Sequence, residues 1–138
     1  MSPENTQRIF NRWPAWFDHA NDPKGSLMRY GFDCGDGWYG IVYNLFERLE
    51  PLVAGLDSGY LHFQVVQGKE KFGELRIYLS GSTDEMDQVI EDAISASKST
   101  CEECGQPGTL QQRSVRVDEN VMRRMSGEKD GLEWTVAK

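Results

Sequence analysis

The sequence has no long apolar run, few cysteines and few histidines, and each shortage narrows the classes of function. No stretch approaches the ~18 consecutive apolar residues that a membrane-spanning helix needs. The opening stretch MSPENTQRIF lacks the charged-then-apolar layout of a signal peptide. We therefore expect a cytoplasmic protein with no membrane partner.

Cysteine and histidine are too few for a metal site of the usual kind. The three cysteines are an odd number for a disulfide framework, and a cytoplasmic C-x-x-C pair such as Cys101 and Cys104 is more typical of metal binding or redox chemistry. A structural zinc site takes four ligands in a tetrahedron, yet no cysteine or histidine follows Cys104. We expect no metal and no cofactor; if zinc is bound, Cys34 or one of the two histidines, His19 and His62, would have to join the pair.

No catalytic constellation is recognisable. Glu102 and Glu103 lie between the paired cysteines, where negative charge disfavours a reactive thiolate. His19 stands beside Asp18, but no known motif places a serine or cysteine nucleophile near it. The stretch GDGWYG lacks the strand–G-x-G-x-x-G–helix context of a dinucleotide site. We expect a protein that is not an enzyme, with a C-x-x-C turn that holds the end of the preceding helix.

Length and composition indicate one globular domain. The 138 residues match a typical domain, and 38% hydrophobic with 27% charged residues is an ordinary globular composition. The net charge of -7 opposes binding to phosphate backbones, so direct nucleic-acid binding by the whole molecule is not expected. The same charge favours a partner with a basic surface.

Two helices are expected before the sheet. The first begins at Pro3 and ends before Pro14, and the second is capped by Asp36 and ends at Pro51. Residues 27–34 are expected to form a short extended piece. The rings expected to close one end of the core are Trp13, Trp16 and Phe17. The apolar residues at helical spacing in the second helix are Trp38, Val42, Leu45, Phe46 and Leu49.

A hairpin and a third helix are expected next. Residues 60–67 and 74–80 alternate apolar and polar side chains, and the short connection GKEKFG favours an antiparallel hairpin. Ser82 and Glu85 form a capping box, which predicts a helix over 83–98. Its apolar stripe consists of Met86, Val89, Ile90, Ala93 and Ile94. Of these, Met86, Val89, Ile90 and Ile94 are expected to pack on Phe63, Val65, Leu75 and Ile77.

The expected architecture is one α+β domain over 1–138, with a small antiparallel sheet packed against two or three helices. We divide it into an aromatic-rich N-terminal segment (1–29), a core (30–100) and a C-terminal segment (101–138). The C-terminal segment is expected to hold short strands after the cysteine pair, a brief helix capped by Asp118, and a tail strand. The alternating residues of that tail strand are Leu132, Trp134 and Val136.

Two groups of residues are candidates for binding. The acidic group, expected to bind a partner, consists of Asp84, Asp87, Glu91, Asp92, Glu128 and Asp130. Acids in the first turn of a helix are also favoured by its dipole, so an ordinary solvated face is the alternative. The second group, on the hairpin, consists of Lys69, Lys71, Phe72, Arg76 and Tyr78. Interleaved rings and cations are typical of single-stranded nucleic-acid binding, and equally of an ordinary exposed hairpin.

Three stretches in this order, CGDGWYGIVYNLFERLE, QVVQGKEKFGELRIYLSG and CEECGQPGTL, resemble a family of small phage and prophage proteins. The match covers roughly residues 30–110. Typical members continue to a later Cys-x-x-His-like pair that completes a zinc site, and this chain departs from the pattern after Leu110. The resemblance implies a phage-type origin but no particular activity.

From the acidic charge, the missing catalytic motifs and this resemblance, we expect a protein that binds a host protein complex without catalysis. The expected action, in the host cytoplasm, is inhibition of a nucleic-acid-targeting defence system, as anti-CRISPR proteins do. The alternative is a nucleic-acid-associated accessory or regulatory protein that uses the Lys69–Tyr78 hairpin.

Overall fold

The computed structural model describes residues 1–20, 22, 26–56, 63–112 and 132–136. These residues form three α-helices and two separate antiparallel two-stranded sheets, so the expected α+β class is confirmed. The helices are α1 (Pro3–Arg12), α2 (Tyr39–Ala54) and α3 (Asp84–Lys98). The strands are β1 (Val65–Lys71), β2 (Glu74–Leu79), β3 (Gly108–Gln112) and β4 (Leu132–Val136).

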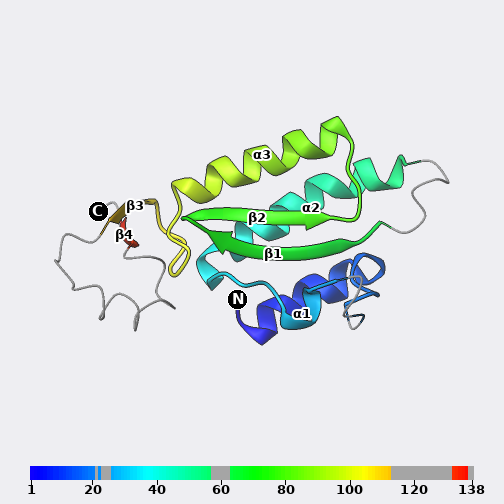
Figure 1. Cartoon of the computed structure of the whole chain (residues 1–138), viewed down its shortest axis with the longest axis horizontal. Coiled ribbons are helices and arrows are strands. Elements are labelled where there is room, and N and C mark those ends of the chain that lie inside the picture. The colour runs from blue at the N-terminus through cyan, green and yellow to red at the C-terminus, as the bar shows by residue number, and fades with distance from the viewer. Residues whose placement is uncertain (21, 23–25, 57–62, 113–131, 137–138) are drawn as a thin grey trace.

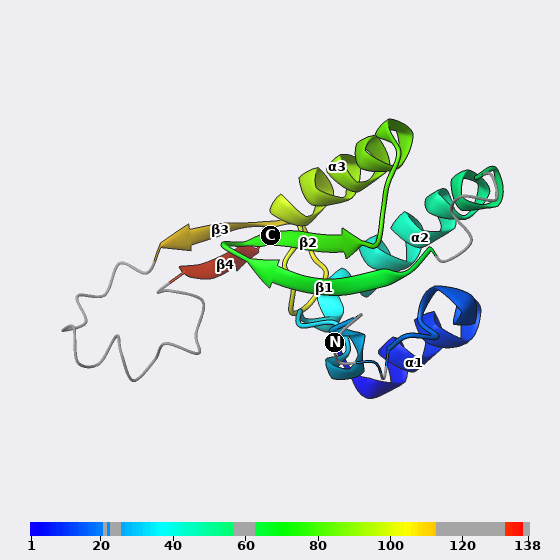
Figure 2. The same cartoon turned by 45° about the vertical axis from the view of Figure 1, so that its right-hand side comes forward.

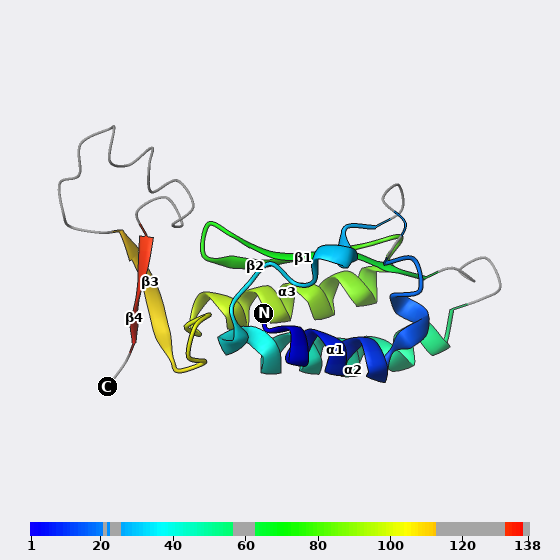
Figure 3. The ribbon, with the colours of Figure 1, turned by 90° about the horizontal axis from the view of Figure 1, so that it is seen from below.

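The β1–β2 sheet forms one layer and the helices form the other (Figures 1 and 3). α3 packs against both α2 and β2, and the apolar core lies between the two layers. The largest fully buried side chains include Trp38, Phe46, Ile9, Met28, Leu45, Leu49, Leu75 and Met86. Across the part of the chain that is described, every helix is too short or too polar to cross a membrane.

α1 begins and ends where the sequence predicts. Pro3 occupies its first turn, and the Ser2 hydroxyl caps the helix by accepting a hydrogen bond from the amide of Asn5 at 3.2 Å. The helix stops at Arg12, before Pro14. The ring cluster that follows is buried as expected: Trp13 stacks on Trp16 with 5.6 Å between ring centroids.

α2 differs from the prediction at both ends. Asp36 does not cap it, because this residue lies in a 3₁₀ turn (η3, Asp36–Trp38) and its carboxylate accepts hydrogen bonds from the amide of Ser2 and the side chain of Asn5. These hydrogen bonds hold the pKa of Asp36 below its ordinary value. Pro51 does not end α2 either: its carbonyl still accepts from Gly55 at 3.1 Å, so the helix continues to Ala54.

The segment before α2 is not the extended piece that was predicted. It forms a 3₁₀ turn, η2 (Met28–Tyr30), and then meets β1 through a single bridge between Asp33 and Lys69. The amide of Leu27 donates to the carbonyl of Val66, which places η2 beside the same strand. A buried methionine explains the turn, since helical geometry brings Met28 into the core.

The hairpin forms, but later in the chain than predicted. β1 begins at Val65 and runs through Lys71, so most of GKEKFG belongs to the strand and the turn is only Phe72–Gly73. Both turn residues have positive φ, 54° and 81°, as a two-residue hairpin turn of type I′ requires. The register shifts between Val65 and Gln67, where one extra residue forms a bulge. Positions 60–62 of the predicted strand lie outside the described residues.

α3 is capped one residue later than predicted. Thr83, not Ser82, accepts from the amide of Met86 at 3.3 Å, while the Ser82 hydroxyl donates to Asp87. The stripe is confirmed at Met86, Val89 and Ala93, which are buried. Ile90 is only half-buried, and Ile94 lies outside the core cluster because small residues take the central positions. Those small buried residues are Ala93 and Ser97.

β3 and β4 pair in register, from Gly108 opposite Val136 to Gln112 opposite Leu132. The predicted tail strand is therefore confirmed. Figures 1 and 2 show this ladder at the end of the molecule where the β1–β2 turn lies. The helix predicted after Asp118 lies outside the described residues.

Candidate functional site

Two motifs that lie far apart in the sequence meet at one end of α2. The amide of Gly37 donates to the carbonyl of Glu102 at 2.6 Å, and the amide of Gly35 donates to the Glu102 carboxylate at 3.0 Å. The indole of Trp38 donates to the carbonyl of Thr100 at 2.7 Å. We call this contact between residues 34–38 and 100–105 the clasp. It joins the start of α2 to the end of α3.

The clasp depends on glycine because the two backbones touch. A Cβ on Gly35 would lie 2.3 Å from the carbonyl oxygen of Glu102, and one on Gly37 would lie 2.3 Å from that of Cys101. Contacts that short do not occur between real side chains and backbone. The sequence shows both glycines, but no pattern in it indicated that they lie against the cysteine turn.

The cysteines hold this turn and do not form a metal cluster. Cys34 and Cys101 are buried, Cys104 is exposed, and none of the three forms a disulfide. Gly105 donates its amide to the carbonyl of Cys101 at 2.8 Å, which closes the C-x-x-C turn as predicted. Among the described residues, no three cysteines, histidines or carboxylates come close enough to hold a metal.

Of the two histidines, the structure describes only His19. His19 is exposed, and its ring lies 3.7 Å from Asp18, an ion pair only when the ring is protonated. Its backbone amide donates to the side chain of Gln64. His62 lies outside the described residues.

The hairpin residues gather on one side of the sheet. Three cross-strand pairs, Gln67–Tyr78, Lys69–Arg76 and Lys71–Glu74, alternate with the pairs that carry the buried residues Leu75 and Ile77. Because paired residues point to the same side and neighbours alternate, these three pairs face away from the helices. Figure 3 shows α1, α2 and α3 all on the other side. We call the three pairs, with Phe72 at the tip, the open sheet face.

The charges of the open sheet face are only partly compensated. Lys69 lies directly opposite Arg76, a pairing of like charges that costs stability. Glu74 binds Arg76 at 3.1 Å and also Lys98 at 3.4 Å. Lys69 and Lys71 form no ion pair with any residue that the structure describes. The Nε atom of Arg76 is buried and lacks a hydrogen-bond partner within the described chain.

Large apolar side chains are also exposed on or beside this face. Phe72 is 64% exposed at the turn and Tyr78 is 44% exposed on β2. Leu27 and Tyr30 are exposed on the η2 segment, which lies along β1. The predicted group Lys69, Lys71, Phe72, Arg76 and Tyr78 is thus brought together on one surface.

The acidic group is brought together only in part. Asp84, Asp87 and Glu91 are exposed on α3, and the first two complement the positive end of the helix dipole. Asp92 instead binds Arg48 of α2 at 3.0 Å, and this hydrogen bond, with a second from Gln88, lowers the pKa of Asp92. The other two predicted acids, Glu128 and Asp130, lie outside the described residues.

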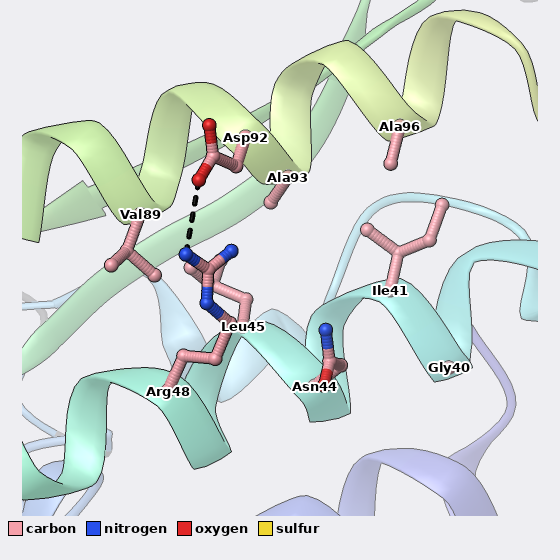
Figure 4. Close-up of a pocket in the computed structure, with 9 residues that line it drawn as sticks. All are labelled: Gly40, Ile41, Asn44, Leu45, Arg48, Val89, Asp92, Ala93 and Ala96. Carbon is pink, nitrogen blue, oxygen red and sulfur yellow. Dashed lines mark hydrogen bonds and ion pairs between the residues drawn. The ribbon is translucent and has the colours of Figure 1, made fainter.

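A shallow groove between α2 and α3, with a volume of about 330 Å³, was not predicted (Figure 4). The Arg48–Asp92 ion pair spans it. The groove exists because small residues, Gly40, Ala93 and Ala96, line it where the helices pass each other. Their spacing is the one signal in the sequence that pointed to it.

No known protein family, curated protein or solved structure matches this chain.

Proposed function

We propose that this protein acts without catalysis, by binding a protein partner through the open sheet face. One observation carries the proposal: a sheet face free of helices in the described chain exposes Tyr78 and Phe72 among three cations. Tyrosine, phenylalanine and arginine are enriched in protein interfaces, where they supply most of the binding energy.

Charge favours a protein over a nucleic acid as the partner. The net charge of -7 repels a polyphosphate at long range, and Glu74 already neutralises Arg76 locally. The negative net charge also attracts a partner whose surface is basic overall. At the interface, Lys69 and Lys71 then pair with individual carboxylates of that partner. Together with the resemblance to phage proteins, this supports a host protein complex that handles nucleic acid, such as a defence system, as the partner.

The acidic face of α3 is the second candidate surface. It is favoured because Asp84, Asp87 and Glu91 are exposed and form no ion pair with the described residues. A basic surface on the host complex would complement it. Binding through this face alone would depend on exposed charges, which salt screens over ~8–10 Å.

Two variants with charge changes of equal size separate these surfaces. Tagged protein is used to capture partners from host cells, as wild type, as Lys69→Glu with Lys71→Glu, and as Asp87→Lys with Glu91→Lys. We expect the first variant to lose the complex and the second to retain it with slower association. Thermal unfolding of each variant verifies that the fold persists.

If Lys69→Glu with Lys71→Glu retains the complex and Asp87→Lys with Glu91→Lys loses it, the binding surface is the acidic face of α3 instead. A mobility shift of labelled single-stranded DNA or RNA by the wild type would favour the nucleic-acid alternative and contradict the proposed protein partner.

A further inference from the structure

Phe72 combines two unfavourable properties at one position. Its backbone is in the left-handed region, with φ of 54°, which is disfavoured for a bulky residue and is usually filled by asparagine or glycine in this turn. Its ring is also 64% exposed, so the core gains nothing from it. A strained backbone without compensating burial marks a residue that is not there for stability.

The surrounding turn holds the ring in place. The side chain of Glu70 accepts a hydrogen bond from the amide of Gly73 at 2.8 Å. The backbone of Lys71 lies opposite that of Glu74 in the β1–β2 ladder. The ammonium group of Lys71 lies 5.7 Å from the centroid of the Phe72 ring. The tip therefore presents an apolar ring with a cation beside it, and no described carboxylate pairs with that cation.

We infer that Phe72 is the anchor of the interface: it enters an apolar pocket on the partner protein, whose rim carries a carboxylate that meets Lys71. This inference rests on the proposed function, because it assigns the centre of the same surface. A buried aromatic anchor is what dominates most protein interfaces, and a rigid two-residue turn presents it without loss of loop entropy.

Other occupants fit the tip less well. A nucleic acid would stack on the ring but meets the net charge of -7. A membrane surface needs a larger apolar face than a single exposed ring at a turn. A second copy of this chain offers the α2–α3 groove of about 330 Å³, but a contact between the tip and that groove joins two different surfaces and would form rings or open chains of molecules, which are less common than two-fold dimers.

A photo-crosslinking competition tests the inference. The probe is the full chain with Phe72→p-benzoylphenylalanine, irradiated in host-cell extract, and untagged variants compete for the adduct. We expect an adduct with a host protein, for which wild type competes and Phe72→Asn competes about tenfold less well or worse. Glu47→Gln, which changes an exposed residue on α2 outside the open sheet face, should compete like wild type.

Stability provides the second readout. Asn-Gly is the preferred pair for this turn, so Phe72→Asn should unfold at a higher urea concentration than wild type while it binds less. Weaker competition with unchanged or lowered stability would contradict the strain that the inference assumes.

The other outcomes are distinguishable. If Phe72→Asn competes like wild type but Lys69→Glu with Lys71→Glu does not, Phe72 is not the anchor, and the open sheet face remains the proposed binding surface. If neither loses competition, both are wrong. An absent adduct, or one formed with nucleic acid, lipid or a second copy, overturns the inference.

Discussion

At the scale of single residues, the missing side chains of Gly35 and Gly37 let two distant segments touch. The Cys101–Glu102 backbone lies where a Cβ of either glycine would be, and the amides of both glycines bond to Glu102. The clasp therefore fixes the start of α2 against the end of α3 without metal ligands from the described chain.

Gly37→Ala tests the clasp, with Gly40→Ala as a matched control three residues along. In Gly37→Ala, the new methyl group would lie 2.3 Å from the carbonyl oxygen of Cys101. We therefore expect a loss of about 1–3 kcal/mol in the free energy of unfolding. Gly40 has open space and lies in α2, so its replacement should gain about 0.5 kcal/mol. Urea denaturation measures both; equal effects would mean that the clasp contributes little.

Asp92 makes stability depend on pH. Its pKa is lowered in the folded state by Arg48 and then Gln88, so its contribution is fully present above the unfolded pKa of about 3.9 and is lost as the pH falls through the lower folded value. Asp92→Asn should therefore destabilise the protein at neutral pH, and its difference from wild type should shrink below about pH 4. Glu47→Gln on α2 is the control, since no described cation pairs with Glu47. A pH-independent difference for Asp92→Asn would contradict the role of the ion pair.

At the scale of elements, α3 contacts α2 and β2 through one narrow stripe of buried side chains. Met86 is fully buried, whereas Ile94 lies outside the core although it follows the same spacing. Small residues at Ala93 and Ser97 bring the helix close to its neighbours, and the Ser97 hydroxyl accepts from the amide of Leu75 at 3.0 Å.

The stripe predicts unequal costs for two similar truncations. Met86→Ala should lower the free energy of unfolding by about 2–5 kcal/mol, as large-to-small changes in a core do. Ile94→Ala should cost less than about 1 kcal/mol because the side chain is partly solvated. Chemical denaturation at one pH decides this; comparable losses would place Ile94 in the core after all.

Sequence patterns predicted these elements better than their ends. Apolar residues recur about every 3.6 positions in α2 and α3 and every second position in the hairpin. These spacings correctly predicted helices and strands, because burial of one face of an element imposes them. Pro14 follows the end of α1 but Pro51 does not end α2, because a proline in the last turn removes one donor and leaves its carbonyl free to accept from Gly55. Caps are decided by tertiary contacts as well: Asp36 binds α1 residues instead of capping α2.

At the scale of the whole molecule, helices cover one side of the β1–β2 sheet and the described chain leaves the other side open. Arg76 and Tyr78 could be placed on this face from the alternation in residues 74–80, whereas Lys69 was expected in the connection and lies in β1 instead. The clasp could not be predicted, because it joins segments more than sixty positions apart and each of these hydrogen bonds has a backbone atom on one side, which no side-chain pattern reveals. The acidic group is brought together only in part, and a local pattern does not reveal that Asp92 binds Arg48 of α2.

The most direct test of the account is an amide chemical-shift map of the isotope-labelled protein with and without the captured partner. The account predicts that the largest changes fall on Lys69, Phe72, Arg76 and Tyr78, with α3 nearly unchanged. Changes concentrated on Asp84–Glu91, with the open sheet face unaffected, would contradict it.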